Sequence, residues 1–138
     1  MTKGSILLVT TLALAGPACS KDAATTTTAA STARTTDTFT GTVPIAGSAL
    51  HTFTVSQTGQ VDATLTSAGP PSTIVMGLMI GLTADSKCVP FAGASAIGQA
   101  GTAPQLSGTI SAGTLCVEVH DIGNQTDPVT YTVTVTHP

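Results

Sequence analysis

Residues 113–138, GTLCVEVHDIGNQTDPVTYTVTVTHP, contain the clearest structural pattern in the chain. Apolar and polar residues alternate in two runs, one that follows Gly113 and one from Val129 to Val135. In the second run valine and tyrosine occupy one parity and threonine occupies the other. Successive side chains of a strand point to opposite faces, so each run predicts a β-strand with one buried face.

The same period of two continues toward the N-terminus. Phe53 and Val55 alternate with threonines, and 61–65 alternates again after the Thr58-Gly59 turn signal. Residues 74–82 are apolar at every second position and carry glycine, valine and methionine between them, which predicts a central strand buried on both faces. Gly-x-x-x-Gly within that run also occurs in membrane helices, but nine residues are too few to span a bilayer.

Residues 89–104 have small side chains and no clear period, so we expect a long loop there that holds at most one short strand. Seven or eight short strands joined by Gly, Pro and Asn favour an all-β fold, a single antiparallel β-sandwich. Charged residues form 8% of the chain, and its four basic and seven acidic residues are scattered singly. This pattern gives no support to nucleic-acid binding through a basic patch.

The N-terminus is typical of an export signal. Lys3 precedes the apolar run 6–15, and small residues follow it, so we expect residues 1–18 to be a cleaved signal peptide. Cys19 directly after Ala18 resembles the lipobox of bacterial lipoproteins, which implies a lipid anchor on that cysteine. Ordinary cleavage after Ala15 or Ala18 stays an alternative, because Gly16 stands where lipoboxes usually carry an aliphatic residue.

Residues 19–36 are rich in threonine and alanine and show no apolar period. They therefore predict a flexible tether that makes almost no packed contact with the domain at 37–138. Within that domain Cys88 and Cys116 are the two cysteines, and export to an oxidising compartment predicts a disulfide between them. Cys116 has the parity opposite to Val117, so the bridge is expected on the outer face, where it would hold the middle loop.

Few residues have the types and spacing that chemistry requires. Asp121, Asn124 and Asp127 place three oxygen donors near a glycine and make a candidate calcium loop, while the same residues also fill ordinary turns. The three histidines, His51, His120 and His137, are widely separated and have no metal-ligand spacing. His51 shares the parity of Phe53 and Val55, which predicts packing near the core edge, and His137 is next to the chain end, where we expect poor order. No nucleophile elbow or phosphate-binding loop occurs, so we expect no catalytic centre and no cofactor other than calcium.

The arrangement of the predicted strands resembles a known family. The stretches GTVPIAGSALHTFTVSQTGQVDATLTS and SAGTLCVEVHDIGNQTDPVTYTVTVTHP look like the bacterial pre-peptidase C-terminal domain. The resemblance covers nearly all of 37–138 and implies a jelly-roll-like sandwich of the kind attached to secreted peptidases, to which collagen-binding modules are similar. The middle strand begins Ser72-Thr73, where the family often has acidic residues, which weakens the transfer of a calcium site.

These features together predict a non-catalytic lipoprotein module of the bacterial cell envelope, located at the outer membrane or facing the periplasm, or else secreted. We expect it to be a binding or structural module, with an adhesive or polymer-binding role toward a protein or polysaccharide ligand. We expect it to be attached to the membrane through a lipid on Cys19. One alternative is an accessory subunit of a secreted peptidase or envelope complex. Another is an enzyme of unrecognised type, which a deep pocket with converging polar groups would favour.

Overall fold

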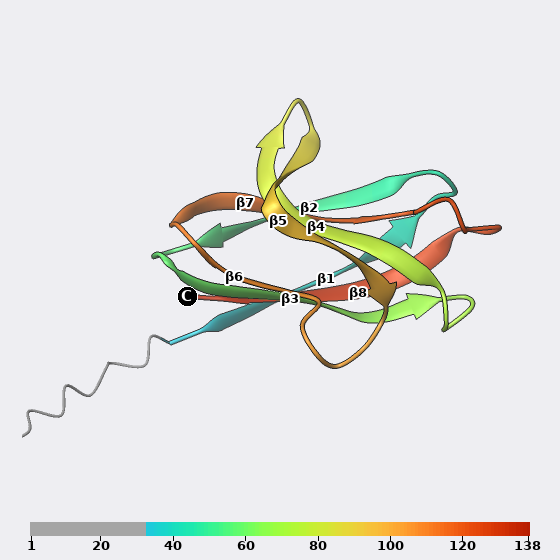
Figure 1. The fold of residues 1–138 in the computed structure, drawn as a ribbon, viewed down its shortest axis with the longest axis horizontal. Coiled ribbons are helices and arrows are strands. Elements are labelled where there is room, and N and C mark those ends of the chain that lie inside the picture. The colour runs from blue at the N-terminus through green and yellow to red at the C-terminus, as the bar shows by residue number, and fades with distance from the viewer. Residues whose placement is uncertain (1–32) are drawn as a thin grey trace, which may run out of the picture. The chain divides into compact units, whose positions relative to one another are not determined.

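The structure, a computed structural model, describes residues 33–138 as eight β-strands without a helix (Figure 1). The predicted signal peptide, Cys19 and the predicted tether up to residue 32 lie outside the described residues. The strands are β1 (Thr35–Val43), β2 (Ser48–Val55), β3 (Gly59–Gly69), β4 (Val75–Ala84), β5 (Lys87–Gln99), β6 (Leu106–Ile110), β7 (Gly113–His120) and β8 (Val129–His137).

The strands form two four-stranded antiparallel sheets, in the orders β1-β8-β3-β6 and β2-β7-β4-β5. The outermost strands in sequence, β1 and β8, pair with each other, and so do β2 with β7, β3 with β6 and β4 with β5. This nested pairing is that of a long hairpin folded over into two layers, which is the jelly-roll arrangement. The predicted all-β, jelly-roll-like sandwich is confirmed, with eight strands.

The core lies between the two sheets and follows the predicted alternation. In β8 the residues Val129, Tyr131, Val133 and Val135 are buried, while the threonines between them are less so. Phe53 and Val55 of β2 and the apolar parity of β7 face the same interior. Burying branched side chains from both inner faces removes their apolar surface from water, which is the main stabilising contribution to such a sandwich.

Strand β4 lies between β7 and β5, as the heavy apolar run predicted. Met76, Leu78 and Ile80 are almost fully buried on its inner face. On its outer face the two glycines allow close approach, since a Cβ on Gly77 would overlap the His120 ring and one on Gly81 would overlap the Val89 carbonyl. The two glycines therefore let groups of the neighbouring strands β7 and β5 pack closely on β4.

The expectation of a loop at 89–104 is wrong, because β5 extends over thirteen residues of Lys87–Gln99. Its pairing with β4 is interrupted by a register shift between Met79 and Gly81, and Gly93 on the bulged segment has a positive φ of 77°. The bulge exchanges the parity of the residues that face the core, since Phe91 and Ala94, at the two ends of the unpaired segment 91–94, both pack inward. That exchange hides the period of two in the sequence.

The predicted disulfide between Cys88 and Cys116 is confirmed, with Cα atoms 5.8 Å apart. As expected, it lies outside the inter-sheet core, yet both cysteines are buried. It joins strand β5 to strand β7 rather than holding a loop. Gly81 of β4 lies between them, and its missing side chain lets the backbone at Val89 pass over it so that Cys88 reaches Cys116.

Strand β1 begins at Thr35, two residues before the predicted start of the domain. Arg34 is also in contact with the sandwich: its guanidinium donates to the carbonyls of Gln60 and Thr136 and lies 2.7 Å from the Asp62 carboxylate. The last residues of the predicted tether, 34–36, therefore belong to the folded domain. The composition of 19–36 concealed this boundary, because threonine suits both an edge strand and a polar linker.

Candidate functional site

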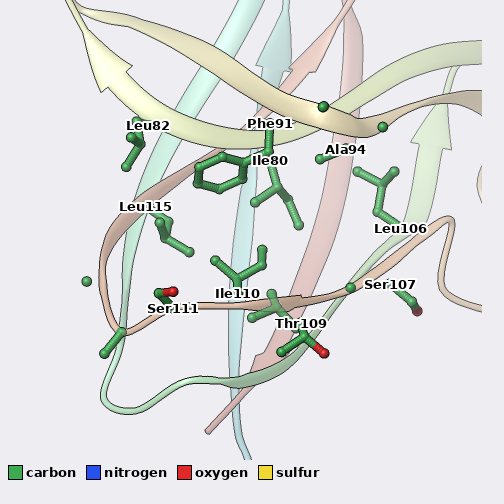
Figure 2. A pocket seen from close by; sticks show the side chains of 16 residues that line it. Ile80, Leu82, Phe91, Ala94, Leu106, Ser107, Thr109, Ile110, Ser111 and Leu115 are labelled. Carbon is green, nitrogen blue, oxygen red and sulfur yellow. The ribbon is translucent and has the colours of Figure 1, made fainter.

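A groove of about 610 Å³ lies between β5 of one sheet and β6 of the other. Both are edge strands, so the groove opens along the side where the sandwich is not closed. Figure 2 shows Phe91, Ile80 and Ile110 converging on this space. It is lined by Val61, Ile80, Leu82, Phe91, Ala92, Gly93, Ala94, Leu106, Ser107, Gly108, Thr109, Ile110, Ser111, Ala112, Gly113 and Leu115.

No lining residue of this groove is charged, and its polar side chains are hydroxyl groups only. Its inner wall consists of buried core residues, among them Val61, Ile80 and Leu115. Leu82 at the rim is 52% exposed, although its sequence pattern placed it in the buried row of β4. Leu82 lies beyond the register shift between Met79 and Gly81, in the end of the β4–β5 hairpin, where it pairs in register with Val89.

Gly108 makes a notch in the middle of the β6 wall. It shares the parity of Leu106, which is buried, and of Ile110, which packs against the core, so its missing side chain would point toward the space between the sheets. A Cβ added there meets no atom within 4 Å. The β6 wall of the groove therefore has room for a side chain at Gly108.

Polar contacts hold the groove at one end and along its outer side. The side chain of Gln105, just before β6, accepts a hydrogen bond from the Leu65 amide at 2.7 Å and donates to the Gln99 carbonyl at 3.2 Å. On β6 itself the Ser107 hydroxyl turns outward and donates to the Asp62 carboxylate at 2.6 Å. These bonds position β6 without placing a charge in the groove.

The predicted calcium residues lie in the β7–β8 connection and have other partners. One oxygen of Asp121 accepts hydrogen bonds from the amides of Gly123, Asn124 and Gln125, and the other accepts from the Ala46 amide at 2.8 Å. Desolvation alone would raise the pKa of Asp121, but these four bonds outweigh it and hold the pKa below its ordinary 3.8. Asp121 thus organises a turn, as the alternative interpretation predicted.

The side chains of Asn124 and Asp127 make no hydrogen bond to the Asp121 carboxylate, and only the backbone amide of Asn124 does so. The Asn124 amide nitrogen donates to the Val75 carbonyl at 3.0 Å, and Asp127 accepts from the neighbouring Thr126 hydroxyl. Within residues 33–138 no group of three or more histidine, cysteine or acidic side chains is placed to hold a metal ion. Calcium binding at these residues stays a prediction.

The three histidines lie apart and have separate structural surroundings. His51 stacks on Phe39 and bonds Tyr131, consistent with its predicted place at the core edge. His120 lies over Gly77, and its buried Nδ1 has no hydrogen-bond partner in the described residues.

His137 was expected to be poorly ordered near the chain end, and that expectation is wrong. It ends β8, is 4% exposed and packs against Phe53. Its Nε2 lies 3.1 Å from the Asp37 carboxylate and its Nδ1 lies 3.1 Å from the Pro138 oxygen. The pairing of β1 with β8 brings Asp37 to this position, which local sequence could not show.

The comparison with models of known protein families gives no match, and the comparison with curated proteins gives none either. No helix among residues 33–138 has the length and hydropathy needed to cross a membrane. The geometry of the groove is therefore the main guide to a function.

Sequence reasoning missed the groove residues, above all Phe91, Gly108 and Ile110. The available signal was the absence of any charged residue between Lys87 and Glu118, a stretch of 30 uncharged residues that includes β6 and all of β5 after Lys87. Such a stretch on two edge strands is unusual, because edge strands commonly carry charged residues.

Proposed function

We propose that the domain is a non-catalytic binding module of the bacterial envelope, and that the groove between β5 and β6 is its binding surface. The observation that supports this most is the uncharged, largely apolar lining of a cavity of about 610 Å³ that opens to solvent. Ligand sites are typically concave, mostly apolar and within a few hundred cubic ångströms of this size.

If the groove binds a polymer, its lining favours a protein ligand over a polysaccharide. Sugar binding commonly uses the flat faces of aromatic rings, and the chain has no Trp, one Tyr and three Phe. Phe91 is the one aromatic residue in the groove lining, and Tyr131 is buried in the core. A partner that inserts aliphatic side chains fits this lining better.

The proposal includes the export signal at 1–18 and the lipid on Cys19. It also includes a relationship to pre-peptidase C-terminal domains, and the jelly-roll order of the strands supports that relationship. The anchor has its own test. Cys19→Ala should move the protein from the membrane fraction to the soluble fraction of the exporting cells. An unchanged distribution would contradict the lipid anchor and leave the groove unaffected.

The groove is tested with the uncharged apolar dye N-phenyl-1-naphthylamine, whose fluorescence rises in apolar surroundings. We expect the full chain to bind it, and Gly108→Leu to weaken binding at least tenfold by filling the notch. Gly98→Leu is the matched control: Gly98 is also in a strand, also has no atom within 4 Å of an added Cβ, and lies outside the groove. Equal binding by both variants, or no binding by the unsubstituted chain, would contradict the proposal.

A further inference from the structure

We infer that the occupant of this groove is an extended, uncharged polypeptide segment that pairs with the free edge of β6 as an added strand. This inference rests on the proposed binding function of the groove. It adds the chemical class of the partner and the way in which its backbone is held.

The free edge of β6 is the first reason. β6 pairs with β3 on one side, and within residues 33–138 no strand pairs with its other side. A strand edge without a neighbour presents backbone N–H and C=O groups that can pair with another chain. A segment added there would extend the sheet β1-β8-β3-β6 along the open side of the sandwich.

The composition of this edge is the second reason. Leu106–Ile110 contains no charged residue and no proline, the two features that most often prevent a strand edge from pairing. The edge of β5 on the opposite wall differs, because it contains Pro90 and the bulge at Gly93. Of the two edges that border the groove, β6 is the one able to accept a regular neighbour.

The charge of the lining selects among partners. Since none of the lining residues is charged, a charged side chain entering the groove would lose hydration without gaining an opposite charge. An aliphatic lipid chain would suit the lining but would leave the backbone groups of β6 without hydrogen bonds. A polypeptide with small or apolar side chains satisfies both the lining and the edge.

The length of β6 agrees with the addition of a short peptide strand. The five residues of β6 span roughly 17 Å at about 3.4 Å per residue. A segment of that length directs two or three alternate side chains into the space between the sheets. The notch at Gly108 lies midway along β6 and would receive the central one.

The test uses an acetylated, amidated seven-residue peptide of alternating threonine and valine, made soluble by a polyethylene glycol tag, and the isotope-labelled full chain. We expect saturable binding, with slower hydrogen exchange at the amides of β6. Two further peptides carry N-methyl groups on alternate residues, one on each parity. One should bind at least tenfold more weakly because its methyl groups face β6, and the other should bind nearly as well as the parent.

Gly108→Leu should abolish peptide binding, whereas Gly98→Leu should retain it. If the dye binds in a Gly108-dependent way but the peptide does not, the strand inference is overturned and the proposed groove function stands. Displacement of the dye by a fatty acid without peptide binding would assign the groove to a lipid. Dimerisation with protection of β6 amides would assign it to a second copy of the chain. Absence of both dye and peptide binding would overturn both proposals.

Discussion

The Nε2 atom of His51 lies 2.6 Å from the hydroxyl oxygen of Tyr131, and this hydrogen bond joins β2 of one sheet to β8 of the other. The His51 ring also stacks on Phe39 of β1, with ring centres 4.8 Å apart. A polar contact of this kind between two packed sheets constrains how they are placed, because a buried donor or acceptor without a partner is destabilising. It lies away from the groove between β5 and β6.

The stability of the domain should fall in mild acid because of His51. Burial lowers the pKa of His51 below its ordinary 6.5, so the unfolded chain binds the proton more readily than the folded one. Stability is fully present above pH 6.5 and is lost as the pH falls through the lowered pKa of the folded state. Urea unfolding at pH 7.5 and at pH 5 measures this, with His51→Gln as the variant that should show less pH dependence. The same pH dependence in both proteins would contradict it.

Removal of the disulfide should destabilise the domain without changing its fold. The bond closes a segment with a sequence separation of 28, which corresponds to about 3 to 4 kcal/mol of unfolding free energy in the chain-entropy description. Replacing both Cys88 and Cys116 by Ala tests this in urea without introducing a buried hydroxyl. A loss below about 1 kcal/mol would indicate that the β4–β5 hairpin is held mainly by packing.

Asp121→Ala should loosen the two connections that its carboxylate joins. The amides of Ala46, Gly123, Asn124 and Gln125 would lose their acceptor and should exchange faster with solvent. Because the folded-state pKa is lowered, the stabilising effect is present above pH 3.8 and disappears as the pH falls through the folded-state value. Asp121→Asn, which keeps one acceptor oxygen, is the milder comparison.

A thermal unfolding experiment with calcium tests the alternative role of Asp121 as a calcium ligand. If calcium raised the Tm of the unsubstituted chain and had no effect on Asp121→Ala, the predicted calcium loop would be favoured over a turn alone. The turn account predicts the same Tm with calcium as with a chelator in both proteins.

Asp62→Asn should expose the peptide bond after Arg34 to trypsin. Arg34 is held by the Asp62 carboxylate and by two carbonyls, which keeps its side chain from entering a protease pocket. Loss of the ion pair should speed cleavage several-fold, followed as the fragment that begins at Thr35. Asp85→Asn, at the exposed turn between β4 and β5, is the control and should cleave at the unsubstituted rate. Equal rates for all three proteins would contradict a holding role for Asp62.

The strands with regular alternation could be predicted because their pattern is local. Val129–Val135 shows its buried face in the sequence, and so do the flanking runs in β2, β3 and β7. Strand β5 could not be predicted, because the bulge around Gly93 breaks the alternation. Its small residues have little preference of their own for strands, and pairing and packing in the folded domain stabilise the strand instead. Cys88 and Cys116 were predictable as the only cysteine pair of the domain.

The groove depends on which strands lie at the open side of the sandwich, and that is a property of the topology. Phe91 and Ile110 are 19 positions apart in the chain and belong to different sheets, so no local pattern joins them. The contacts of His51 with Tyr131 and of His137 with Asp37 are equally remote in sequence. Each requires the nested pairing of the strands to be known first.

The most direct test of the groove as the binding surface is photo-crosslinking in the cells that export the protein. A benzoylphenylalanine replaces Thr109, which lines the groove, or Thr52, which is exposed on β2 outside it. We predict a polypeptide adduct of discrete mass from position 109 that disappears when Gly108→Leu is added and persists with Gly98→Leu. Adducts that form equally from position 52, or that survive Gly108→Leu, would contradict the account.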